Sequence, residues 1–289
     1  MALKELVALH RCANRDCGRE YEARLYPVLG IRYDSSHGYC PECRATEQAK
    51  YEAEELAKWE NELARIRDEW RHQCGIPAKF MAARFKNFDT FWTREPNNFV
   101  LARARCEKYA QEFPLDYRGH LRANGLAYPS MILASPETQG VGKTFLVNAI
   151  AHAILDRWRG ECRLCPVRFL SEASLYQRIE ETYADRGQPK QVNEADIIRQ
   201  MVWVPLLILD DVGTETRRSR DFSNRIMFAV INGRYEANRP VVITTNLSTE
   251  ELNRYLADTD GRVRIMDRLL EMCQGSVFQI RGPSHRGVE

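Results

Sequence analysis

The sequence predicts an α/β protein with a parallel β-sheet at its core, preceded by a small metal-binding module and a long helix. Three observations support this expectation. Short apolar runs alternate with helical patterns in the C-terminal part, four cysteines stand in two pairs near the N-terminus, and a charged stretch without glycine or proline joins the two regions. Strands buried on both faces of a parallel sheet appear as such short continuous apolar runs.

The composition is that of a folded protein with a full core. Of the 289 residues, 44% are hydrophobic and 28% are charged, and the formal net charge is +2. Because the chain is nearly neutral, any contact with nucleic acid must come from a local basic surface. We expect a cytoplasmic protein that does not contact a membrane, because no apolar run approaches the ~18 residues of a membrane span. The N-terminus also becomes charged too early for a signal peptide.

Four cysteines near the N-terminus predict a zinc site. Two cysteine pairs can bring four thiolates around one tetrahedral zinc ion, and the expected ligands are Cys12, Cys17, Cys40 and Cys43. His10 and His37 are alternative ligands, and four free cysteines in a surface domain are the alternative without metal. We place this zinc ribbon at residues 1–45. Its small core would need the metal for much of its folding free energy.

A long amphipathic helix is predicted at residues 46–75. Its apolar residues recur at the three-and-four spacing of a coiled coil, and they are Leu56, Trp59, Leu63, Ile66 and Trp70. Tryptophans on such a stripe are unfavourable in water. The helix is therefore expected to pack either on the chain's own domains or on another protein. Gly75 and Pro77 end it, and the third predicted domain covers residues 76–289.

A phosphate-binding loop is predicted between the strand Met131–Ala134 and a helix that starts near Lys143. Gly140 and Gly142 permit a tight turn whose N–H groups form an anion nest. The helix N-terminus adds the positive end of its dipole. The residues expected to bind nucleotide are Gly140, Val141, Gly142, Lys143, Thr144 and Phe145.

The side chains of this loop have distinct expected roles. Lys143 is expected to reach the β- and γ-phosphates, and the Thr144 hydroxyl to ligate Mg²⁺. The G-x-x-x-x-G-K-[ST] pattern requires glycine where this chain has Glu137. Its carboxylate would either repel phosphate or face solvent, and a chance match in an unrelated turn is the remaining alternative. Aromatic residues upstream, including Phe88, either anchor the core or meet the adenine.

Two carboxylates follow a strand predicted at residues 206–209. Open parallel sheets bind ligands at the carboxyl ends of their strands. Asp210 is therefore expected to hold Mg²⁺, and Asp211 to orient and polarise the attacking water. Asn246 follows a further buried strand and is placed to hydrogen-bond the γ-phosphate or that water. An acidic pair after a strand is weak evidence alone, but strong when it follows a phosphate-binding loop.

A basic segment after the acidic motif predicts contact with nucleic acid. Guanidinium groups suit a phosphate backbone, and an aromatic ring suits base stacking. The residues concerned are Arg217, Arg218, Arg220 and Phe222. The alternative is a solvated, charged helix start. A final strand is expected at residues 276–280.

Taken together, these motifs resemble the DnaC/DnaI/IstB family of AAA+ ATPases. The resemblance covers residues 74–282 and rests on the phosphate-binding loop, the acidic motif, the Thr-Thr-Asn sequence ending at Asn246, and the segment from Arg264 to Arg268. It implies a P-loop NTPase fold with a five-stranded parallel sheet and no C-terminal helical lid. It also implies that Asn246 is sensor 1 and that Arg264, or as second choice Arg268, is an arginine finger that reaches a neighbouring subunit's ATP.

Two departures from the family pattern concern the rate of hydrolysis. Glu137 replaces the first glycine of the loop, and Asp211 stands where many relatives have glutamate. Together they suggest slow hydrolysis, with nucleotide acting more as a switch than as fuel.

The resemblance also implies partners. Helicase loaders of the DnaI type carry a zinc-containing N-terminal domain that grips the replicative helicase, and the order of modules here looks similar. The expected function is that of an ATP-dependent loader of a hexameric replicative helicase onto single-stranded DNA. Its cofactors would be ATP, Mg²⁺ and Zn²⁺, and its ATPase domains would self-associate. The alternatives are an IstB-like transposition helper on duplex DNA and a non-hydrolysing, nucleotide-bound adaptor.

Overall fold

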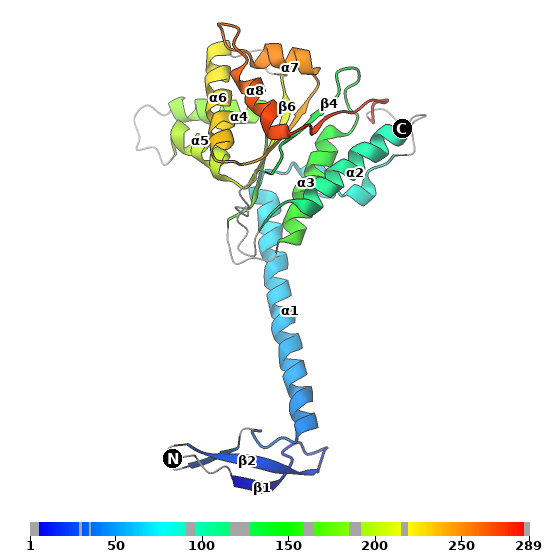
Figure 1. Ribbon diagram of the computed structural model, residues 1–289, viewed down its shortest axis with the longest axis vertical. Helices are drawn as coiled ribbons and strands as arrows, with labels where there is room; N and C mark the ends of the chain where they lie inside the picture. The colour runs from blue at the N-terminus through cyan, green and yellow to red at the C-terminus, as the bar shows by residue number, and fades with distance from the viewer. Residues whose placement is uncertain are drawn as a thin grey trace. The chain divides into compact units, whose positions relative to one another are not determined.

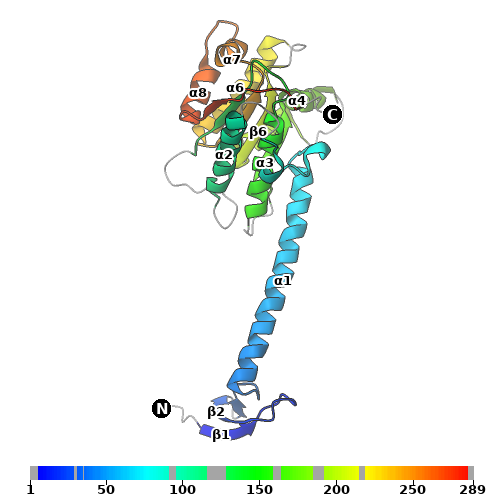
Figure 2. The ribbon, with the colours of Figure 1, turned by 90° about the vertical axis from the view of Figure 1, so that its right-hand side faces the viewer.

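The protein forms two compact units, Met1–Arg65 and Ile66–Glu289 (Figures 1 and 2). The computed structural model describes residues 6–28, 31–34, 36–90, 96–115, 128–158, 164–184, 192–214 and 219–285. The boundary between the units lies inside helix α1 (Pro41–Gln73). The long helix is thus shared between the two units, and the domain boundaries expected at residues 45 and 75 stay predictions.

The first unit contains a three-stranded antiparallel sheet in the order β1-β2-β3. The strands are β1 (Leu6–Arg11), β2 (Glu20–Val28) and β3 (Ile31–Asp34). Its described core is small and consists of Tyr21, Ala23 and the cysteine side chains. Helix α1 begins at Pro41, earlier than the expected residue 46. Proline is favourable at the first helical position because its missing N–H would have no intrahelical partner there.

The apolar stripe of α1 is not buried uniformly. The side chain of Trp70 is 2% exposed, and its ring lies 4.2 Å from that of Trp158. Arg67 reinforces this contact by donating a 2.6 Å hydrogen bond to the Trp158 carbonyl oxygen. Leu56 and Trp59 are instead 54% and 42% exposed. The last residues of the helix thus pack within the second unit, and Leu63 is also buried, whereas the first two residues of the stripe face solvent.

The second unit is built on a five-stranded sheet in the order β5-β6-β7-β4-β8, and all neighbouring strands are parallel. The strands are β4 (Met131–Ala134), β5 (Val167–Ser171), β6 (Leu206–Val212), β7 (Val241–Thr245) and β8 (Val277–Gln279). This sheet confirms the predicted α/β fold. Strands β4 and β7 are buried along their whole length, as expected for strands covered on both faces.

Helices cover this sheet, and α2 and α3 lie side by side (Figures 1 and 2). The helices are α2 (Pro96–Glu112), α3 (Lys143–Arg157), α4 (Glu172–Ala184), α5 (Glu194–Trp203), α6 (Arg220–Glu236), α7 (Thr249–Leu256) and α8 (Arg264–Cys273). Short 3-10 turns occur at Ala78–Phe80 and Phe85–Asn87. One core cluster packs α4 to α8 against the sheet. The described residues after β8, 280–285, contain no helix.

Arg234 of α6 anchors the starts of β6 and β7. Its fully buried guanidinium donates to the carbonyl oxygens of Met201, Val202, Val204 and Pro205 before β6, and of Pro240 before β7. Burial lowers its pKa to about 9, and the carbonyl acceptors satisfy the charge in place of a carboxylate. The opposite ends of the same two strands carry the predicted site residues. No helix in the described part of the chain is both long and apolar enough to span a membrane.

Candidate functional site

A cavity of about 570 Å³ lies where the central strands β4, β6 and β7 end. Every residue predicted to bind nucleotide, from residue 140 to residue 145, lines this cavity. Asp210, Asp211 and Asn246 line it as well. The fold therefore brings together the phosphate-binding loop, the acidic pair and the polar residue after β7, which are far apart in the sequence.

The loop before α3 has the backbone of an anion-binding turn. Gly140 and Gly142 have φ values of +80° and +90°, a region that favours glycine. A Cβ atom at Gly142 would also approach the Phe88 ring to 2.6 Å. Gly142 is the N-cap of α3, and no side chain caps this helix. The N–H groups of a first helical turn lack intrahelical acceptors, so this end of α3 suits a phosphate group.

Lys143 connects the loop to the residues after β6 and β7. Its side chain is 6% exposed, and its Nζ donates to Asn246 Oδ1 at 2.6 Å and to the Ser135 hydroxyl. The Asn246 Nδ2 donates in turn to Asp211 Oδ1 at 2.9 Å. This chain of hydrogen bonds connects an ammonium group, an amide and a carboxylate that all line the cavity.

Asp210 forms the second polar chain. The Thr144 hydroxyl donates to both of its carboxylate oxygens at 3.1 Å, and the Thr244 hydroxyl donates at 2.6 Å. Burial raises the pKa of Asp210, and the hydrogen bonds from Thr244 and Thr144 oppose this rise. A hydroxyl and a carboxylate side by side are the hard oxygen ligands that Mg²⁺ prefers. Thr144 and Asp210 therefore fit the predicted magnesium site.

Asp211 reaches the cavity because the strand is irregular. Its φ is +60°, which is uncommon for a residue other than glycine. The β6–β7 pairing shifts register between Leu209 and Val212, as at a β-bulge. The Asp211 N–H donates to the Thr244 hydroxyl at 2.8 Å, which holds this conformation. Successive side chains of a regular strand point to opposite faces, whereas here both carboxylates line one cavity.

Glu137, which departs from the loop pattern, has an ion-pair partner. Its carboxylate lies 3.4 Å from Arg281 Nε, and both side chains are more than half exposed. Glu137 is not among the described residues that line the cavity. Of the two alternatives from the sequence, a carboxylate directed away from the phosphate position agrees with the structure.

Glu172 is a buried polar residue behind the acidic loop whose role no sequence motif indicates. It is the first residue of α4 and is 0% exposed. Its carboxylate accepts hydrogen bonds from the Gly213 N–H at 2.9 Å, the Tyr176 hydroxyl at 2.9 Å and the Tyr255 hydroxyl at 3.0 Å. Gly213 follows the acidic pair by two residues. Glu172 therefore holds the acidic loop to α4 and α7 through partners that no local pattern reveals.

We expect Glu172→Gln to destabilise the second unit and to slow turnover. The amide replaces one acceptor oxygen by a donor, which leaves buried N–H or O–H groups unsatisfied at a cost of about 1–3 kcal/mol. The measurement is thermal unfolding together with steady-state ATP hydrolysis. Glu181→Gln, at an exposed position of the same helix, is the matched control and should leave both unchanged. Equal unfolding midpoints for the two variants would contradict the role assigned to Glu172.

The predicted arginine fingers lie outside this cavity. Arg264 Nη2 is 3.0 Å from Asp258 Oδ2, and its side chain is 53% exposed. Arg264 and Arg268 both place their guanidinium groups near the Phe228 ring, at 4.9 and 5.1 Å. Neither is among the described residues that line the nucleotide cavity. An arginine finger that serves a neighbouring subunit would lie away from its own site, so both residues stay candidates.

The predicted DNA contacts are only partly described. Arg217 and Arg218 lie outside the described residues. Arg220 is exposed and donates to the Arg254 carbonyl oxygen at 2.7 Å. Phe222 is half-buried, with its ring 5.8 Å from that of Tyr176. At the start of α6, the guanidinium of Arg220 is thus exposed, whereas the ring of Phe222 packs partly on the core. The DNA contact stays a prediction.

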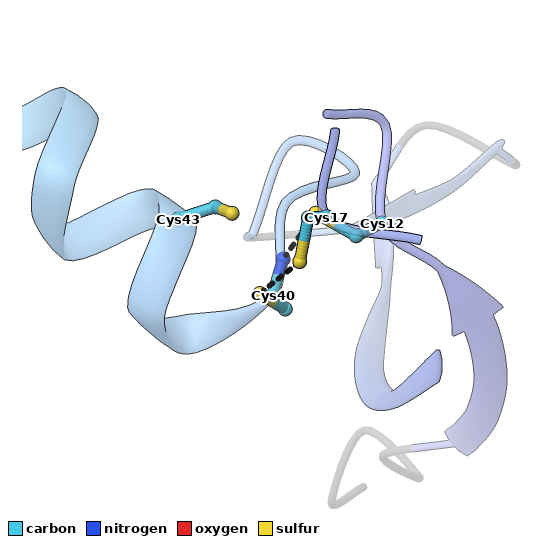
Figure 3. A group of neighbouring side chains, drawn as sticks. All are labelled: Cys12, Cys17, Cys40 and Cys43. Carbon is cyan, nitrogen blue, oxygen red and sulfur yellow. Dashed lines mark hydrogen bonds between the residues drawn. The ribbon is translucent and has the colours of Figure 1, made fainter. Parts of the chain in front are cut away.

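The four N-terminal cysteines converge in the first unit (Figure 3). The sulfur atoms of Cys12, Cys17, Cys40 and Cys43 all lie within 4.8 Å of one another. The Cys17 and Cys40 sulfurs are 3.7 Å apart, close to the ~3.8 Å edge of a tetrahedron with zinc–sulfur bonds of ~2.3 Å. A hydrogen bond from the Cys40 N–H lowers the pKa of Cys12 to about 7, whereas a hydrogen bond with the Cys17 side chain raises the pKa of Cys43 to about 12. The donor set therefore fits zinc.

The histidine considered as an alternative ligand has another partner. His10 Nδ1 lies 3.5 Å from Asp34 Oδ2. Neither His10 nor His37 belongs to the metal-ligating group found among the described residues. The all-cysteine assignment thus agrees with the structure.

Comparisons with known proteins bear on the second unit. A model of the IstB-like ATP binding protein family matches residues 129–288. A crystal structure of DnaI is similar at 21% identity and a TM-score of 0.51, covering 73% of this chain and 95% of that chain. A crystal structure of the DnaC helicase loader is similar at 20% identity and a TM-score of 0.52, covering 71% of this chain and 100% of that chain. No curated protein matches.

These matches show two things. The structural matches, at such low identity, show the fold, which is the AAA+ type of α/β sheet. The family model extends over more than half of the chain, including the phosphate-binding loop and the acidic pair. The protein therefore belongs to the family of IstB-like ATP-binding proteins.

Proposed function

We propose that the protein is an ATP-dependent loader that places a hexameric replicative helicase on single-stranded DNA, with nucleotide acting as an assembly switch. The observation that carries this proposal is that the two units of the chain have different candidate binding features. One unit holds a nucleotide cavity with converging polar groups, and the other holds a four-cysteine cluster and exposed apolar side chains. The fold similarity to a helicase loader supports the same assignment.

Each polar group of the nucleotide site has a role in this proposal. The α3 N-terminus and Lys143 would bind the phosphates, while Thr144 and Asp210 would hold Mg²⁺. Bound Mg²⁺ neutralises charge on the triphosphate. Asp211 accepts a hydrogen bond from the attacking water and orients it, and Asn246 positions Asp211 through their 2.9 Å hydrogen bond. Aspartate is shorter than glutamate, so its reach toward the water is reduced, which supports slow hydrolysis.

A second copy of the chain completes the site in this proposal. Arg264 is exposed and paired with Asp258 within its own chain. In an assembly it would exchange this carboxylate for the γ-phosphate of a neighbouring subunit. Nucleotide would thereby favour self-association of the ATPase domains, with single-stranded DNA contacting Arg217, Arg218, Arg220 and Phe222.

We expect Arg264→Ala to bind ATP normally and to lose DNA-stimulated turnover by about 10³-fold, the typical contribution of an arginine finger. Binding is spared because Arg264 is not among the described residues of its own cavity. The measurement is ATP affinity and ATP hydrolysis with and without single-stranded DNA. Arg268→Ala is the comparison variant. If Arg264→Ala hydrolyses ATP at the normal rate, the finger is not Arg264.

The partner-binding part of the proposal rests on the first unit and the middle of α1. Leu9 of β1 is 67% exposed, and Trp59 is 42% exposed. In this proposal, these exposed apolar side chains contact the helicase. In a loading assay, the full-length chain should transfer a hexameric helicase onto circular single-stranded DNA only with ATP. Trp59→Ser should reduce this transfer without changing ATP affinity.

The family match favours a second candidate, a transposition helper that acts on duplex DNA with a transposase. That function predicts ATP-dependent filaments on duplex DNA and no helicase loading. Absence of turnover with DNA and partner present would instead support a non-hydrolysing adaptor. The helicase-loading assay, electron microscopy of filaments on duplex DNA and an ATP turnover assay thus separate the three candidate functions.

A further inference from the structure

The segment that follows β8 crosses the phosphate-binding loop. The His285 N–H donates to the Gly140 carbonyl oxygen at 2.9 Å. Four residues earlier, Arg281 pairs with Glu137 of the same loop at 3.4 Å. The Arg281 N–H also donates to Asn98 Oδ1 at 3.0 Å, which ties the segment to α2. Two separate points of the segment are thus fastened to the loop that is expected to bind phosphate.

The ring of His285 packs within an aromatic group beside the loop. Its centroid lies 5.5 Å from that of Phe88 and 5.4 Å from that of Phe99. A Cβ atom at Gly142 would lie 3.5 Å from His285 Nε2. Gly282 permits this path, since its φ is +145° and a Cβ atom there would meet the Phe99 ring at 2.4 Å. Residues 282–285 are therefore closely fitted to the loop and to α2.

The cavity is lined by two chemically different groups of residues. One group is Lys143, Asp211 and Asn246, which are joined by hydrogen bonds and suit a phosphate tail. The other group contains Phe88 and Phe145, whose ring centroids are 5.6 Å apart, and His285. Planar apolar groups suit a nucleotide base. Burial lowers the pKa of His285, so its ring is neutral near neutral pH and suits stacking better than an ionic contact with phosphate.

We infer that residues 282–285 form a wall of the nucleotide site and that His285 contacts the base of a bound adenine nucleotide. This inference rests on the proposed nucleotide-binding function and adds a residue to it. The segment would add the His285 ring to the aromatic part of the cavity lining, beside Phe88. Glu137 contributes a second, solvent-exposed contact between the segment and the loop through its ion pair with Arg281.

The test compares two ligands and two variants of the full-length chain by calorimetry. ATP carries the base, whereas inorganic tripolyphosphate carries only the phosphate tail. We expect His285→Ala to weaken ATP binding about tenfold, the typical loss of one base-stacking contact, with tripolyphosphate binding unchanged. His285→Phe keeps an aromatic ring and should bind ATP within about twofold of the wild type. Thermal unfolding without ligand should be the same for all three proteins.

Each other outcome overturns the inference. If His285→Ala binds ATP as tightly as the wild type, the ring does not contact the base. If both ligands lose affinity equally, the segment only supports the loop. If the wild type binds tripolyphosphate more tightly than it binds ATP, the base adds no affinity and the aromatic residues do not form a base site. If the wild type binds neither ligand, the proposed nucleotide site fails together with this inference, so the two failures are distinguishable.

Discussion

Lys143→Ala should weaken ATP binding about a hundredfold or more. The ammonium group is nearly buried and donates to Asn246 within the cavity. Loss of a hydrogen-bonded charge from a desolvated site costs about 2–5 kcal/mol. Without the lysine, the phosphates would lose the ammonium group that the loop itself supplies within the cavity. The measurement is titration calorimetry with ATP and Mg²⁺.

A matched control separates this effect from general charge loss. Lys86→Ala removes one positive charge from an exposed residue that is not among the described cavity-lining residues. It should bind ATP as the wild type does. Both variants should unfold cooperatively at similar temperatures. ATP affinity of Lys143→Ala within about threefold of the wild type would mean that this cavity is not the nucleotide site.

Removal of zinc should unfold the first unit and leave the second intact. The described core of the first unit comprises little beyond Tyr21, Ala23 and the cysteine side chains. Structural zinc contributes about 10–16 kcal/mol of apparent binding free energy in small domains of this kind. We expect about one zinc ion per chain by metal analysis. After chelation, proteolysis should become rapid within the N-terminal sheet, while ATP binding persists.

Two cysteine variants test, without a chelator, whether zinc stabilises the first unit. Cys40→Ser removes one of the four clustered thiolates and should lose zinc and protease resistance together. Cys165→Ser changes a cysteine of the second unit that donates to the Val167 carbonyl oxygen at 3.1 Å, a contact that serine can reproduce. It should retain zinc. A Cys40→Ser protein whose N-terminal sheet stays protected and metal-free would show that the sheet folds without zinc.

Several elements follow from the sequence alone because their signals are local. The strand Met131–Ala134 and the start of α3 at Lys143 are as predicted, since an apolar run and a glycine turn specify them within a few residues. The cysteine cluster could also be predicted from the sequence, because two cysteine pairs at this spacing can supply the four thiolates of a zinc site. The parallel sheet follows from the same apolar runs.

The tertiary structure decided the features that depend on distant partners. Asp211 enters the cavity only because β6 bulges against β7 and Thr244 holds its backbone. Glu172 accepts a hydrogen bond from Gly213 in the acidic loop. Glu137 pairs with Arg281, which is distant from it in the sequence. Periodicity reports which face of an element is apolar, but it carries no information about which distant hydrogen-bond donor or acceptor will meet a given side chain. Only folding brings those groups together, and their hydrogen bonds are stronger where they are buried away from water.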